Sequence, residues 1–505
     1  MHNLNYDARI IIENIKLNSK NIKKAYIIEK ENNIYSISFK INKKKIEFRC
    51  SYKMIPISIK KIAEKFNISE KKKDINFNII SWEWLEKKEN ISLVKKYCKN
   101  DVVILKKSLE KFREEVLNNY SIDIYIENIY SLSSLSHKIF FENFNKYKVK
   151  SDEQTHTNII RQAYFGGRCE VFGNLKENED MYYFDFESMY PTCQAEEKFP
   201  IEEGTYIINP KKINFGIYNI DFISNINIPV LPVKHNNKLL FPNGKNLNGT
   251  YFSKEIILFL ENSGIIKKIN WGIEWNEKKT YHIFEDFVKT FKEKRKENKD
   301  NKIIYKNLMN SLYGRFAIRN SENEIKFIFN KYEEKWELQK VKKEKKDIES
   351  NIILSVITTS AARIKLYKSF IEVYNNKGRV LYCDTDSIFA AFKKDEDLKK
   401  MKWNLLNFEK KNEKIFFISP KAYIIGEDAK IKGLKLSDNI IKKNIIEKTY
   451  DSFIKNIKMY ISQIRIKKYN ITKLKNESYI KEFTFENTKR IWRDKKKLET
   501  DPIEL

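Results

Sequence analysis

Two hydrophobic periods alternate in the first part of the chain. Apolar and polar residues take turns over residues 34–40 and 45–49, which is the pattern of half-buried strands. Over residues 59–66 and 102–112 the apolar positions recur every three to four residues, which predicts helices that bury one face. Strands mixed with amphipathic helices predict an α/β unit up to about residue 150.

The middle of the chain combines a strand, an insertion and two helices. An apolar run at 181–186 ends in an acid and predicts a buried strand. Pro and Gly residues cluster between 196 and about 280, which predicts a strand-and-loop insertion. Apolar residues at helical spacing over 284–291 and 302–313 then predict two helices, each with a polar face.

The C-terminal part changes from charged to apolar and back. Residues 318–353 are highly charged and predict an exposed hairpin or arm, whereas residues 353–373 have a helical pattern. Apolar segments on either side of Asp-Thr-Asp at 384–386 predict two strands joined by an acidic turn. From residue 434 onward, Lys-rich segments predict a helical basic lobe.

Composition narrows the class of protein. With 505 residues, 41% of them hydrophobic, the chain can build several cores, which excludes disorder as its main state. A formal net charge of +29 predicts a polyanionic partner, and nucleic acid is favoured over an anionic membrane surface. An AT-rich coding genome is an alternative source for part of this charge, because Lys, Ile and Asn are all frequent.

Several classes of site are not expected. No run approaches the roughly 18 uncharged apolar residues of a spanning helix, so no membrane partner is predicted. The first residues lack the pattern of a signal or import leader. The 5 cysteines are far apart and include no CxxC pair, which speaks against a disulfide framework and a structural zinc site.

Three acids stand where an apolar strand ends. Asp185 closes the run at 181–186, and Asp384 and Asp386 flank the turn between the two later strands. Carboxylates that converge from neighbouring strands suit hard divalent cations, and two such ions can activate an attacking hydroxyl and stabilise a leaving phosphate. Taken alone, however, Asp-Thr-Asp is better explained as an acidic hairpin turn.

Five spaced motifs favour the catalytic interpretation. YYFDFESMYP at 182–191, KNLMNSLYG at 306–314 and YCDTDS at 382–387 resemble, in this order, the three polymerase motifs of family B DNA polymerases. YFGGR at 164–168 and KAY at 421–423 are similar to the Tyr-x-Gly-Gly and Lys-x-Tyr motifs of the protein-primed branch, found in small phages, adenoviruses and mitochondrial linear plasmids. The resemblance covers nearly the whole chain. It implies a mixed α+β right-hand polymerase with palm, fingers and thumb, preceded by an incomplete RNase H-like 3′-5′ exonuclease domain.

The resemblance also implies domain boundaries. They are an exonuclease-like domain lacking its first motif at 1–150, a first palm segment at 151–196, an insertion similar to terminal-protein region 1 at 197–281, fingers at 282–317, an insertion similar to terminal-protein region 2 at 318–353, a second palm segment at 354–433 and a thumb at 434–505. One insertion would orient a priming protein, and the other would encircle DNA.

A role is implied for each motif residue. The implied catalytic residues are Asp185, Asp384, Asp386 and Lys306. The implied nucleotide-binding residues are Phe186, Ser188, Tyr190, Arg295, Lys306, Asn310 and Tyr313. The implied DNA-binding residues are Tyr164, Gly166, Gly167, Arg168, Lys421 and Tyr423.

Two Mg²⁺ ions, or Mn²⁺, are the implied cofactors. Asp185 and Asp386 should bridge the two ions, with Asp384 as a weaker or outer ligand. The Ser188 hydroxyl and the backbone that precedes it should hold the triphosphate. Tyr190 would pack under the deoxyribose and leave no room for a 2′-hydroxyl, and its alternative is an aromatic residue of the core.

The second predicted helix places three of these residues on one face. Lys306 would bind the phosphates and give a proton to pyrophosphate, Asn310 lies one turn on, and Tyr313 would cover the nascent base pair. A solvated surface lysine is the alternative for Lys306. Arg295, or its neighbour Lys294, would add charge to this site, with a solvated basic face as an equal alternative.

The remaining motifs point to DNA. The glycine pair 166–167 would let the backbone approach the template phosphates, with Tyr164 and Arg168 beside it. Lys421 and Tyr423 would hold the primer end, and the basic lobe would clasp duplex DNA nonspecifically. The alternatives are a loop glycine pair and a surface lysine beside a buried tyrosine.

The N-terminal region carries only part of an exonuclease. HNLNYD at 2–7 and YCKND at 97–101 resemble the second and third proofreading motifs, which implies Asp7, Tyr97 and Asp101 as site residues. The first motif, Asp-x-Glu, is absent. Little proofreading is expected from a two-metal nuclease that lacks two of its four acids. The sequence is then either a fragment or a plasmid-derived form whose nuclease half has decayed.

The predicted function is that of a nucleotidyltransferase, a DNA-directed DNA polymerase in the protein-primed replication of a linear plasmid or viral genome. Its expected partners are primer-template DNA, deoxynucleoside triphosphates and a terminal priming protein, and it is expected to act as a monomer. The mitochondrion is the expected location, with a virus or phage in the host cytoplasm as the alternative. The rival functions are a decayed nucleic-acid-binding remnant, a nuclease and an RNA-synthesising enzyme.

Overall fold

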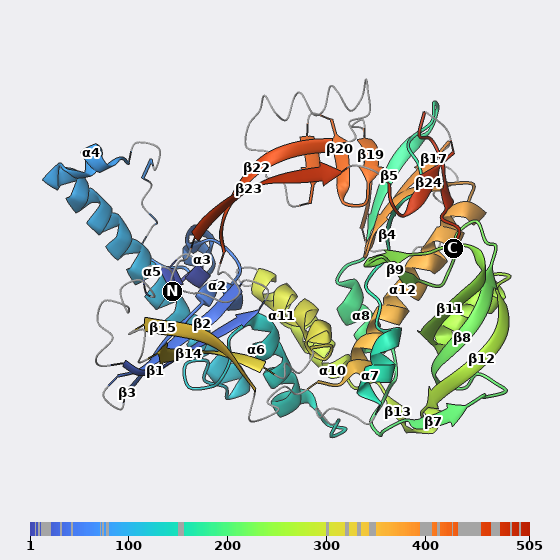
Figure 1. Cartoon of the computed structure of the whole chain (residues 1–505), viewed down its shortest axis with the longest axis horizontal. Helices are drawn as coiled ribbons and strands as arrows, with labels where there is room; N and C mark the ends of the chain where they lie inside the picture. Colours follow the sequence, from blue (N-terminus) through green and yellow to red (C-terminus); the bar gives the residue numbers. More distant parts are fainter. Residues whose placement is uncertain are drawn as a thin grey trace. The chain divides into compact units, whose positions relative to one another are not determined.

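The computed structural model (Figure 1) describes residues 1–5, 7–8, 11, 22–30, 33–41, 44–70, 72, 75–76, 80–149, 156–298, 302–318, 323–330, 335–342, 350–393, 407–411, 415–426, 428–432, 456–465, 475–484, 487–493 and 496–505. The chain divides into two compact units. The first unit comprises Met1–Asn145, Asp286–Ile348 and Ser462–Ser478, and the second comprises Lys146–Glu285, Glu349–Ile461 and Tyr479–Leu505. Each unit is therefore assembled from segments that are distant in sequence.

The first unit contains a five-stranded antiparallel sheet with the strand order β15-β14-β1-β2-β3. Its strands are β1 (Ile22–Lys30), β2 (Asn33–Ile41), β3 (Lys44–Arg49), β14 (Asn323–Asn330) and β15 (Lys335–Lys342). The two strands predicted near the N-terminus are confirmed as β2 and β3. The charged segment is a hairpin, as predicted, and it also extends the N-terminal sheet because β14 pairs with β1.

Helices pack beside this sheet in the first unit. They are α2 (Ser51–Met54), α3 (Ile59–Lys65), α4 (Trp82–Leu85), α5 (Lys88–Tyr120), α6 (Leu132–Ile139), the π-helical turn η3 (Phe140–Phe144), α10 (Glu285–Glu297) and α11 (Lys302–Arg315). The predicted apolar face of α11 is buried at Leu308 and Leu312, and Ser136 Oγ of α6 donates a hydrogen bond to Leu308 O at 2.8 Å. The four helices predicted in this unit are all present.

A five-stranded antiparallel sheet forms the centre of the second unit, with the order β18-β5-β17-β16-β4. Its strands are β4 (Cys169–Val171), β5 (Asp180–Asp185), β16 (Arg379–Asp384), β17 (Ser387–Phe392) and β18 (Asn407–Lys411). The predicted buried strand is β5, and the two predicted strands around the acidic turn are β16 and β17. All three are predominantly buried, as their apolar runs require.

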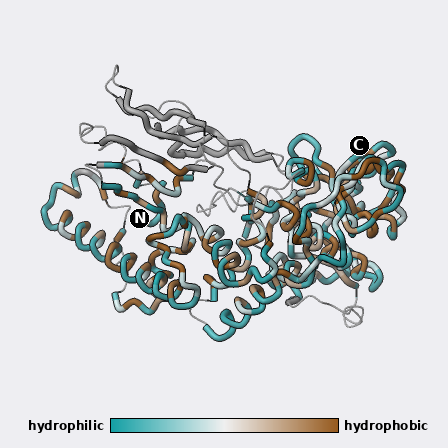
Figure 2. Tube along the Cα trace, turned by 90° about the horizontal axis from the view of Figure 1, so that it is seen from below, coloured by the Kyte–Doolittle hydropathy of each residue, from teal (hydrophilic) through white to brown (hydrophobic). Residues whose placement is uncertain are grey.

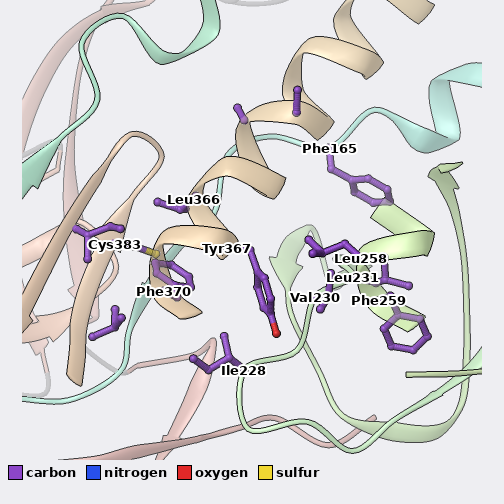
Figure 3. Packing of buried hydrophobic residues seen from close by; sticks show 14 of the residues in the cluster. Phe165, Ile228, Val230, Leu231, Leu258, Phe259, Leu366, Tyr367, Phe370 and Cys383 are labelled. Carbon is purple, nitrogen blue, oxygen red and sulfur yellow. The ribbon is translucent and has the colours of Figure 1, made fainter. Parts of the chain in front are cut away.

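Helix α12 (Ile352–Asn375) packs in the core of the second unit, next to the short helices α7 (Thr157–Ile160), η4 (Arg161–Ala163) and α8 (Met189–Glu196). Leu366, Tyr367 and Phe370 of α12 belong to the same buried cluster as Cys383 of β16 (Figure 3). Because almost every turn of this helix is buried, its sequence is apolar on all sides rather than amphipathic. The predicted helix over 353–373 is confirmed.

The predicted insertion is a small sheet with one helix. Strands β7 (Thr205–Ile208), β8 (Gly216–Ser224), β11 (Gly244–Phe252) and β12 (Ile265–Glu274) pair in the order β11-β8-β12-β7, and α9 (Ser253–Glu261) connects β11 to β12. Strand β9 (Val233–His235) pairs with β10 (Lys238–Leu240), and η5 (Glu277–Lys279) is a short turn. Strands β6 (Phe199–Pro200) and β13 (Thr280–Tyr281) pair and bring the two ends of the insertion together.

The predicted helical lobe beyond residue 434 is wrong for the residues that the structure describes there. They contain the paired strands β22 (Asn456–Arg465) and β23 (Lys475–Thr484), the hairpin of β24 (Arg490–Trp492) and β25 (Thr500–Pro502), and no helix. The Lys content suggested a solvated helix, whereas Ile, Tyr and Thr at alternate positions favour a pleated strand. A further hairpin sheet precedes them, made of β19 (Ile415–Ser419), β20 (Ala422–Ile425) and β21 (Asp428–Ile431).

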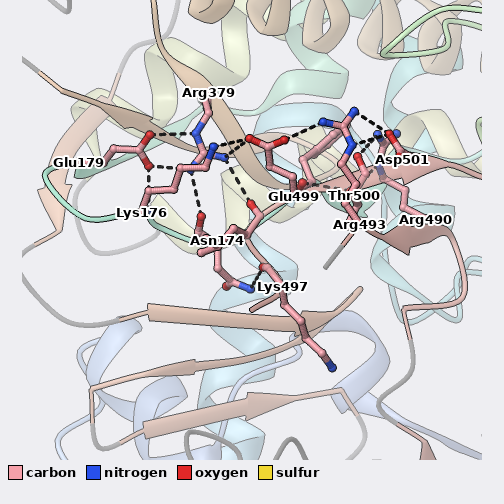
Figure 4. Close-up of polar contacts among 12 residues, drawn as sticks. Asn174, Lys176, Glu179, Arg379, Arg490, Arg493, Lys497, Glu499, Thr500 and Asp501 are labelled. Carbon is pink, nitrogen blue, oxygen red and sulfur yellow. Dashed lines mark hydrogen bonds and ion pairs between the residues drawn. The ribbon is translucent and has the colours of Figure 1, made fainter. Parts of the chain in front are cut away.

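The C-terminal segment is bonded to the edge of the central sheet (Figure 4). Thr500 N–H donates to Phe172 O at 3.0 Å, just beyond β4. Arg379, at the start of β16, donates to both oxygens of Glu179 at 2.9 and 2.6 Å, and Glu499 lies within reach of the same guanidinium. These contacts fix the ends of β5 and β16 that lie opposite their acidic ends.

Hydropathy follows the packing of each unit. Figure 2 shows brown and teal positions in alternation along most of the described helices and strands, as expected for elements that bury one side. Within the described part of the chain, no helix combines the length and the apolar character needed to cross a membrane.

Candidate active site

Two of the three predicted acids come together at neighbouring strand ends. Asp185 is the last residue of β5 and lies opposite Ser387, the first residue of β17. Phe186 N–H donates to Asp386 O at 2.8 Å, which ties the end of β5 to the turn between β16 and β17. We call Asp384, Thr385 and Asp386 the acidic turn. The pairing of β5 with β17 therefore brings Asp185 next to this turn.

The backbone of the acidic turn is strained. Thr385 has φ +63°, in the left-handed region, where a β-branched side chain is disfavoured. Its N–H donates to Arg168 O at 2.7 Å, and Asp386 N–H donates to Asp384 O at the same distance. These hydrogen bonds hold the turn in a conformation that its sequence does not favour.

Asp384 already has a cationic partner. Lys421 Nζ lies 2.9 Å from Asp384 Oδ1. Burial lowers the pKa of Lys421, but the hydrogen bond and the charge of Asp384 outweigh it, so that the pKa lies above its usual value. An acid neutralised by lysine suits an outer position at a metal site better than a bridging one. Lys421 thus meets the acidic turn, and its further role at the primer end stays a prediction.

The other two carboxylates share one environment. Burial, and then the nearby charges of Asp185 and Asp386, raise the pKa of the Tyr183 hydroxyl to about 12. Both carboxylates therefore act on the same group at the end of β5. Among the described residues, no cluster of three or more His, Cys, Asp or Glu side chains is arranged to hold a metal. The donor set that fits a hard divalent cation is this pair of carboxylates, with Asp384 turned to Lys421.

The segment after β5 offers a polar group to the same site. Ser188 precedes α8 with φ +51°, and its Oγ is buried without a hydrogen-bond partner among the described residues. Phe186 is a core residue, so its side chain is not available to a nucleotide. Tyr190 is half-buried and packs against that core, as the alternative of a core aromatic expects, and its position below a sugar stays a prediction.

The loop at residues 164–168, which we call the glycine loop, contacts the acidic turn. A Cβ on Gly167 would lie 2.7 Å from Thr385 Cγ2, whereas a Cβ on Gly166 would meet nothing within 4 Å. Gly167 is thus needed for close contact with Thr385, whereas the space beside Gly166 is open. Close approach of a template phosphate at Gly166 stays a prediction, as does the role of Tyr164.

The prediction of a DNA contact for Arg168 is corrected by its burial. Its side chain is 3% exposed, and its guanidinium pairs with the buried Glu170 at 2.7 Å. It also lies over the ring of Phe241, with 4.0 Å between the guanidinium carbon and the ring centroid. A guanidinium enclosed in this way is held inside the protein and does not reach a phosphate. The motif pattern did not show the burial, because Glu170 and Phe241 lie outside the motif.

One buried ion pair behind the glycine loop was not predicted. Glu255 of α9 and Arg363 of α12 form a bidentate pair at 2.8 Å for both contacts. Arg363 Nη1 also donates to Phe165 O at 2.7 Å and to Gly166 O at 3.2 Å. The only signal in the sequence was an arginine within an otherwise apolar and small-residue helix.

The predicted residues of the fingers lie on α11 in the first unit. Lys306 is exposed, while Asn310 and Tyr313 are half-buried on the face opposite Leu308 and Leu312. The structure thus confirms that one face of α11 packs and that the other carries these polar residues. The palm acids belong to the second unit, so the approach of α11 to the acids stays a prediction.

A neighbouring candidate cation is engaged elsewhere. Lys294 Nζ of α10 donates to Asn119 Oδ1 of α5 at 2.7 Å and lies over the ring of Tyr120. A lysine held by a neighbouring helix is a poor candidate for the triphosphate. Arg295 is half-buried and remains the predicted cation of this helix.

Two of the predicted exonuclease residues lie near each other on α5. Lys72 Nζ is 3.5 Å from Asp101 Oδ2 and 5.5 Å from the ring centroid of Tyr97. Asp7 lies near the N-terminus, where burial raises the pKa of its carboxyl against the opposing charges of Met1 and His2. A lysine thus neutralises Asp101, and the expectation of little proofreading stays a prediction.

Two DNA polymerases are similar in sequence to this chain. A "Probable DNA polymerase" of Podospora anserina is 27% identical over 473 residues, covering 80% of this chain and 39% of that protein. The "DNA-directed DNA polymerase" of Enterobacteria phage PRD1 is 25% identical over 400 residues, covering 75% of this chain and 66% of that protein. The chain therefore spans well under half the length of its fungal relative.

Solved structures establish the fold. Phi29 DNA polymerase, in its complex with primer-template DNA and incoming nucleotide substrates, matches with a TM-score of 0.72 at 20% identity, covering 96% of this chain and 90% of that one. The predicted mixed right-hand polymerase fold is confirmed. The family model described as "DNA polymerase type B, organellar and viral" matches residues 81–403. The chain belongs to this organellar and viral family of type B DNA polymerases.

Proposed function

We propose that this protein is a DNA-directed DNA polymerase that adds deoxynucleotides to a primer 3′ end by two-metal phosphoryl transfer. The observation that carries the proposal is the convergence of Asp185 and Asp386 at neighbouring strand ends, beside the buried Ser188 hydroxyl. Membership of the polymerase family supports the same reaction. The decayed-remnant alternative is the weaker one, because Asp185 and Asp386 are present and lie at neighbouring strand ends.

Each palm residue has a definite task in this mechanism. Asp185 and Asp386 would hold two Mg²⁺ or Mn²⁺ ions, which supply activation of the primer hydroxyl and stabilisation of the leaving phosphate when bound. Asp384 would orient Lys421, and the ammonium of Lys421 would reduce the negative charge of the acidic turn. The Ser188 hydroxyl would donate to a triphosphate oxygen, because it is buried and has no described protein partner.

The sugar and the base would be read by aromatic residues. Tyr190 packs against the core and is therefore rigid enough to exclude a 2′-hydroxyl. On α11, Lys306 would bind the phosphates of the incoming nucleotide, and Asn310 and Tyr313 would line the same face. Tyr423 and Lys421 would hold the primer end, and the backbone at Gly166 would approach the template.

The biological setting follows from the family. The family is described as organellar and viral, so we infer replication of an organellar plasmid or of a viral genome, with the mitochondrion as the first candidate location. Protein priming by a terminal protein is inferred from the motifs of that branch. The +29 net charge supports primer-template DNA as the main partner.

Primer extension on a primed single-stranded template with Mg²⁺ or Mn²⁺ tests the reaction. The Asp386→Asn variant should lose about three orders of magnitude in rate, because several kcal/mol of transition-state stabilisation depend on the metals. Asp180→Asn, at the opposite end of β5, is the matched control and should extend normally. DNA binding without extension by the unchanged protein would instead mean a non-catalytic remnant.

A further inference from the structure

The glycine loop and the acidic turn are in direct contact. Arg168 O accepts the Thr385 N–H at 2.7 Å, and Cys383 Sγ also lies 3.7 Å from Arg168 O. Gly167 faces the Thr385 side chain so closely that no Cβ fits between them without movement. A shift of this loop therefore moves the backbone that carries Asp386.

The insertion holds the glycine loop from the other side. Lys234 Nζ of β9 donates to Tyr164 O at 3.0 Å. Arg168 Nη1 donates to Pro229 O at 2.8 Å, so the end of the loop is also bonded to the insertion. Both ends of the loop are thus attached to a part of the chain that carries none of the acids.

The middle of the loop is held by the Glu255–Arg363 pair. Glu255 of the insertion is 1% exposed and Arg363 of α12 is 5% exposed. The bidentate pair fixes the plane of the guanidinium, and its remaining nitrogen donates to the carbonyls of Phe165 and Gly166. In Figure 3 the Phe165 ring reaches from this loop toward Leu258 of α9, within the core that joins α12 to the insertion.

Such a pair is a poor device for stability alone. Desolvation of two charges offsets much of their attraction, and apolar side chains of similar size often stabilise a fold as well or better. A buried arginine does, however, fix the positions of the carbonyl groups that it binds. The two carbonyls fixed here belong to the residues directly before Gly167.

We propose that Glu255 and Arg363 are positioning residues that couple the insertion to the acidic turn. The coupling runs from α9 through Arg363 to the glycine loop, and from Gly167 and the Arg168 carbonyl to Thr385. A partner or DNA strand that displaces the insertion changes the position of Asp386 by this path. The inference rests on the proposed polymerase function for its catalytic consequence, but not for the mechanical coupling itself.

A charge-swapped pair separates positioning from stability. In the double variant Glu255→Arg with Arg363→Glu, the opposite charges remain, but the side chain at 363 no longer donates to the loop carbonyls. Together with Glu255→Gln and Arg363→Lys, it is compared for melting temperature, for kcat and KM of the nucleotide in primer extension, and for hydrogen–deuterium exchange of the Thr385 amide. Lys279→Met, which breaks the surface ion pair with Glu202, is the matched control.

We expect kcat to fall by about tenfold or more in the swapped protein while KM stays within about twofold, because small misplacement at a reacting centre is costly. Exchange at Thr385 should be faster, even though the melting temperature returns toward that of the unchanged protein. The Lys279→Met control should change none of these quantities. Arg363→Lys, which keeps a donor, should be intermediate.

Recovery of kcat together with the melting temperature in the swapped protein would show a purely structural pair and overturn the proposal. If the unchanged protein shows no extension, the polymerase function fails, and exchange at Thr385 decides the coupling by itself. Unchanged exchange in all variants then overturns the coupling, and faster exchange supports it. If the swapped protein does not fold, the same reading is taken from Arg363→Lys.

Discussion

Three non-glycine residues next to the proposed catalytic site have left-handed backbones. They are Ser188, Thr385 and Lys421, with φ of +51°, +63° and +65°. Each such residue costs on the order of 1–3 kcal/mol and persists only where the surrounding contacts enforce it. At Thr385 those contacts are the hydrogen bond to Arg168 O and the packing against Gly167. Left-handed residues also occur elsewhere in the described part of the chain, but these three lie next to the acids, and contacts of the site hold Thr385 in this conformation.

The two glycines of the loop should respond differently to a methyl group. Gly167→Ala should lower the free energy of unfolding by about 1–3 kcal/mol, because the new Cβ overlaps the Thr385 side chain. Gly166→Ala should stay within about 0.5 kcal/mol, since the space beside it is open. Urea unfolding of the two variants beside the unchanged protein measures both. Equal effects would show that contact with Thr385 does not require glycine.

At the scale of elements, long-range pairing and packing determined where several of the predicted strands and helices lie. The β14–β15 hairpin was predictable from its charge pattern, but its addition to β1 was not, because the pairing joins residues some 300 positions apart, such as Ala25 and Phe327. Helix α6 packs on α11 and buries His137 between aromatic rings of Phe141 and Phe316. The rest of the α6 sequence, Leu-Ser-Ser-Leu-Ser before it and Lys-Ile after it, gives no sign that this histidine is buried.

Burial of His137 should make the fold sensitive to acid. Burial, and then the charge of Arg315, lowers the pKa of His137 to about 3, whereas the unfolded chain takes up the proton near 6.5. A lowered pKa means that stability is complete above about 6.5 and is lost as the pH falls toward 3. Between pH 7 and 4.5, His137→Phe should therefore remove about 2–3 kcal/mol of the loss in unfolding free energy.

Urea unfolding at the two pH values, compared between the unchanged protein and the variant, measures this difference. The exposed His235 provides the control, because His235→Phe should leave the pH dependence as it is. Identical pH dependence of the unchanged protein and His137→Phe would contradict the role of burial. Other titrating groups contribute equally to both proteins and cancel in the comparison.

At the scale of the whole molecule, the positive net charge and membership of a DNA polymerase family both favour DNA as the partner. The net charge of +29 predicts binding that is driven by counterion release from phosphates rather than by base recognition. The palm acids and the acidic turn lie in one compact unit, and the polar face of α11 lies in the other.

DNA affinity should accordingly fall steeply with salt. If about four phosphates are neutralised, the Kd for a primer-template should rise by ~100-fold between 50 and 200 mM salt. Fluorescence anisotropy with a labelled duplex measures the slope, and a duplex of scrambled sequence should give the same one. The Asp386→Asn variant should bind as well as the unchanged protein. A Kd that is independent of salt would refute a phosphate-dominated interface.

The sequence by itself determined most of the local elements and the strand ends at which the three acids lie. Periods of two and of three to four residues are set by backbone geometry, so β2, β3, α3 and α11 were readable from their own residues. The largely buried elements β5, β16, β17 and α12 were readable from their apolar runs instead. The places of Asp185, Asp384 and Asp386 in two of the motifs predicted which strand ends carry the acids. The helical prediction for the Lys-rich segment beyond residue 434 was wrong, because a high charge indicates solvent exposure but does not distinguish a helix from a strand.

Only the tertiary structure decided burial and pairing. The sequence predicted a DNA contact for Arg168, but in the structure Glu170 and aromatic rings enclose its guanidinium. The Glu255–Arg363 pair joins residues that are 108 positions apart in the sequence. Neither the burial of Arg168 nor this ion pair could be predicted from the sequence pattern, because the free-energy cost of burying a charge depends on which partner the fold places beside it. The sequence thus names the reacting groups, and long-range contacts settle which of the charged residues around them are free to meet a substrate.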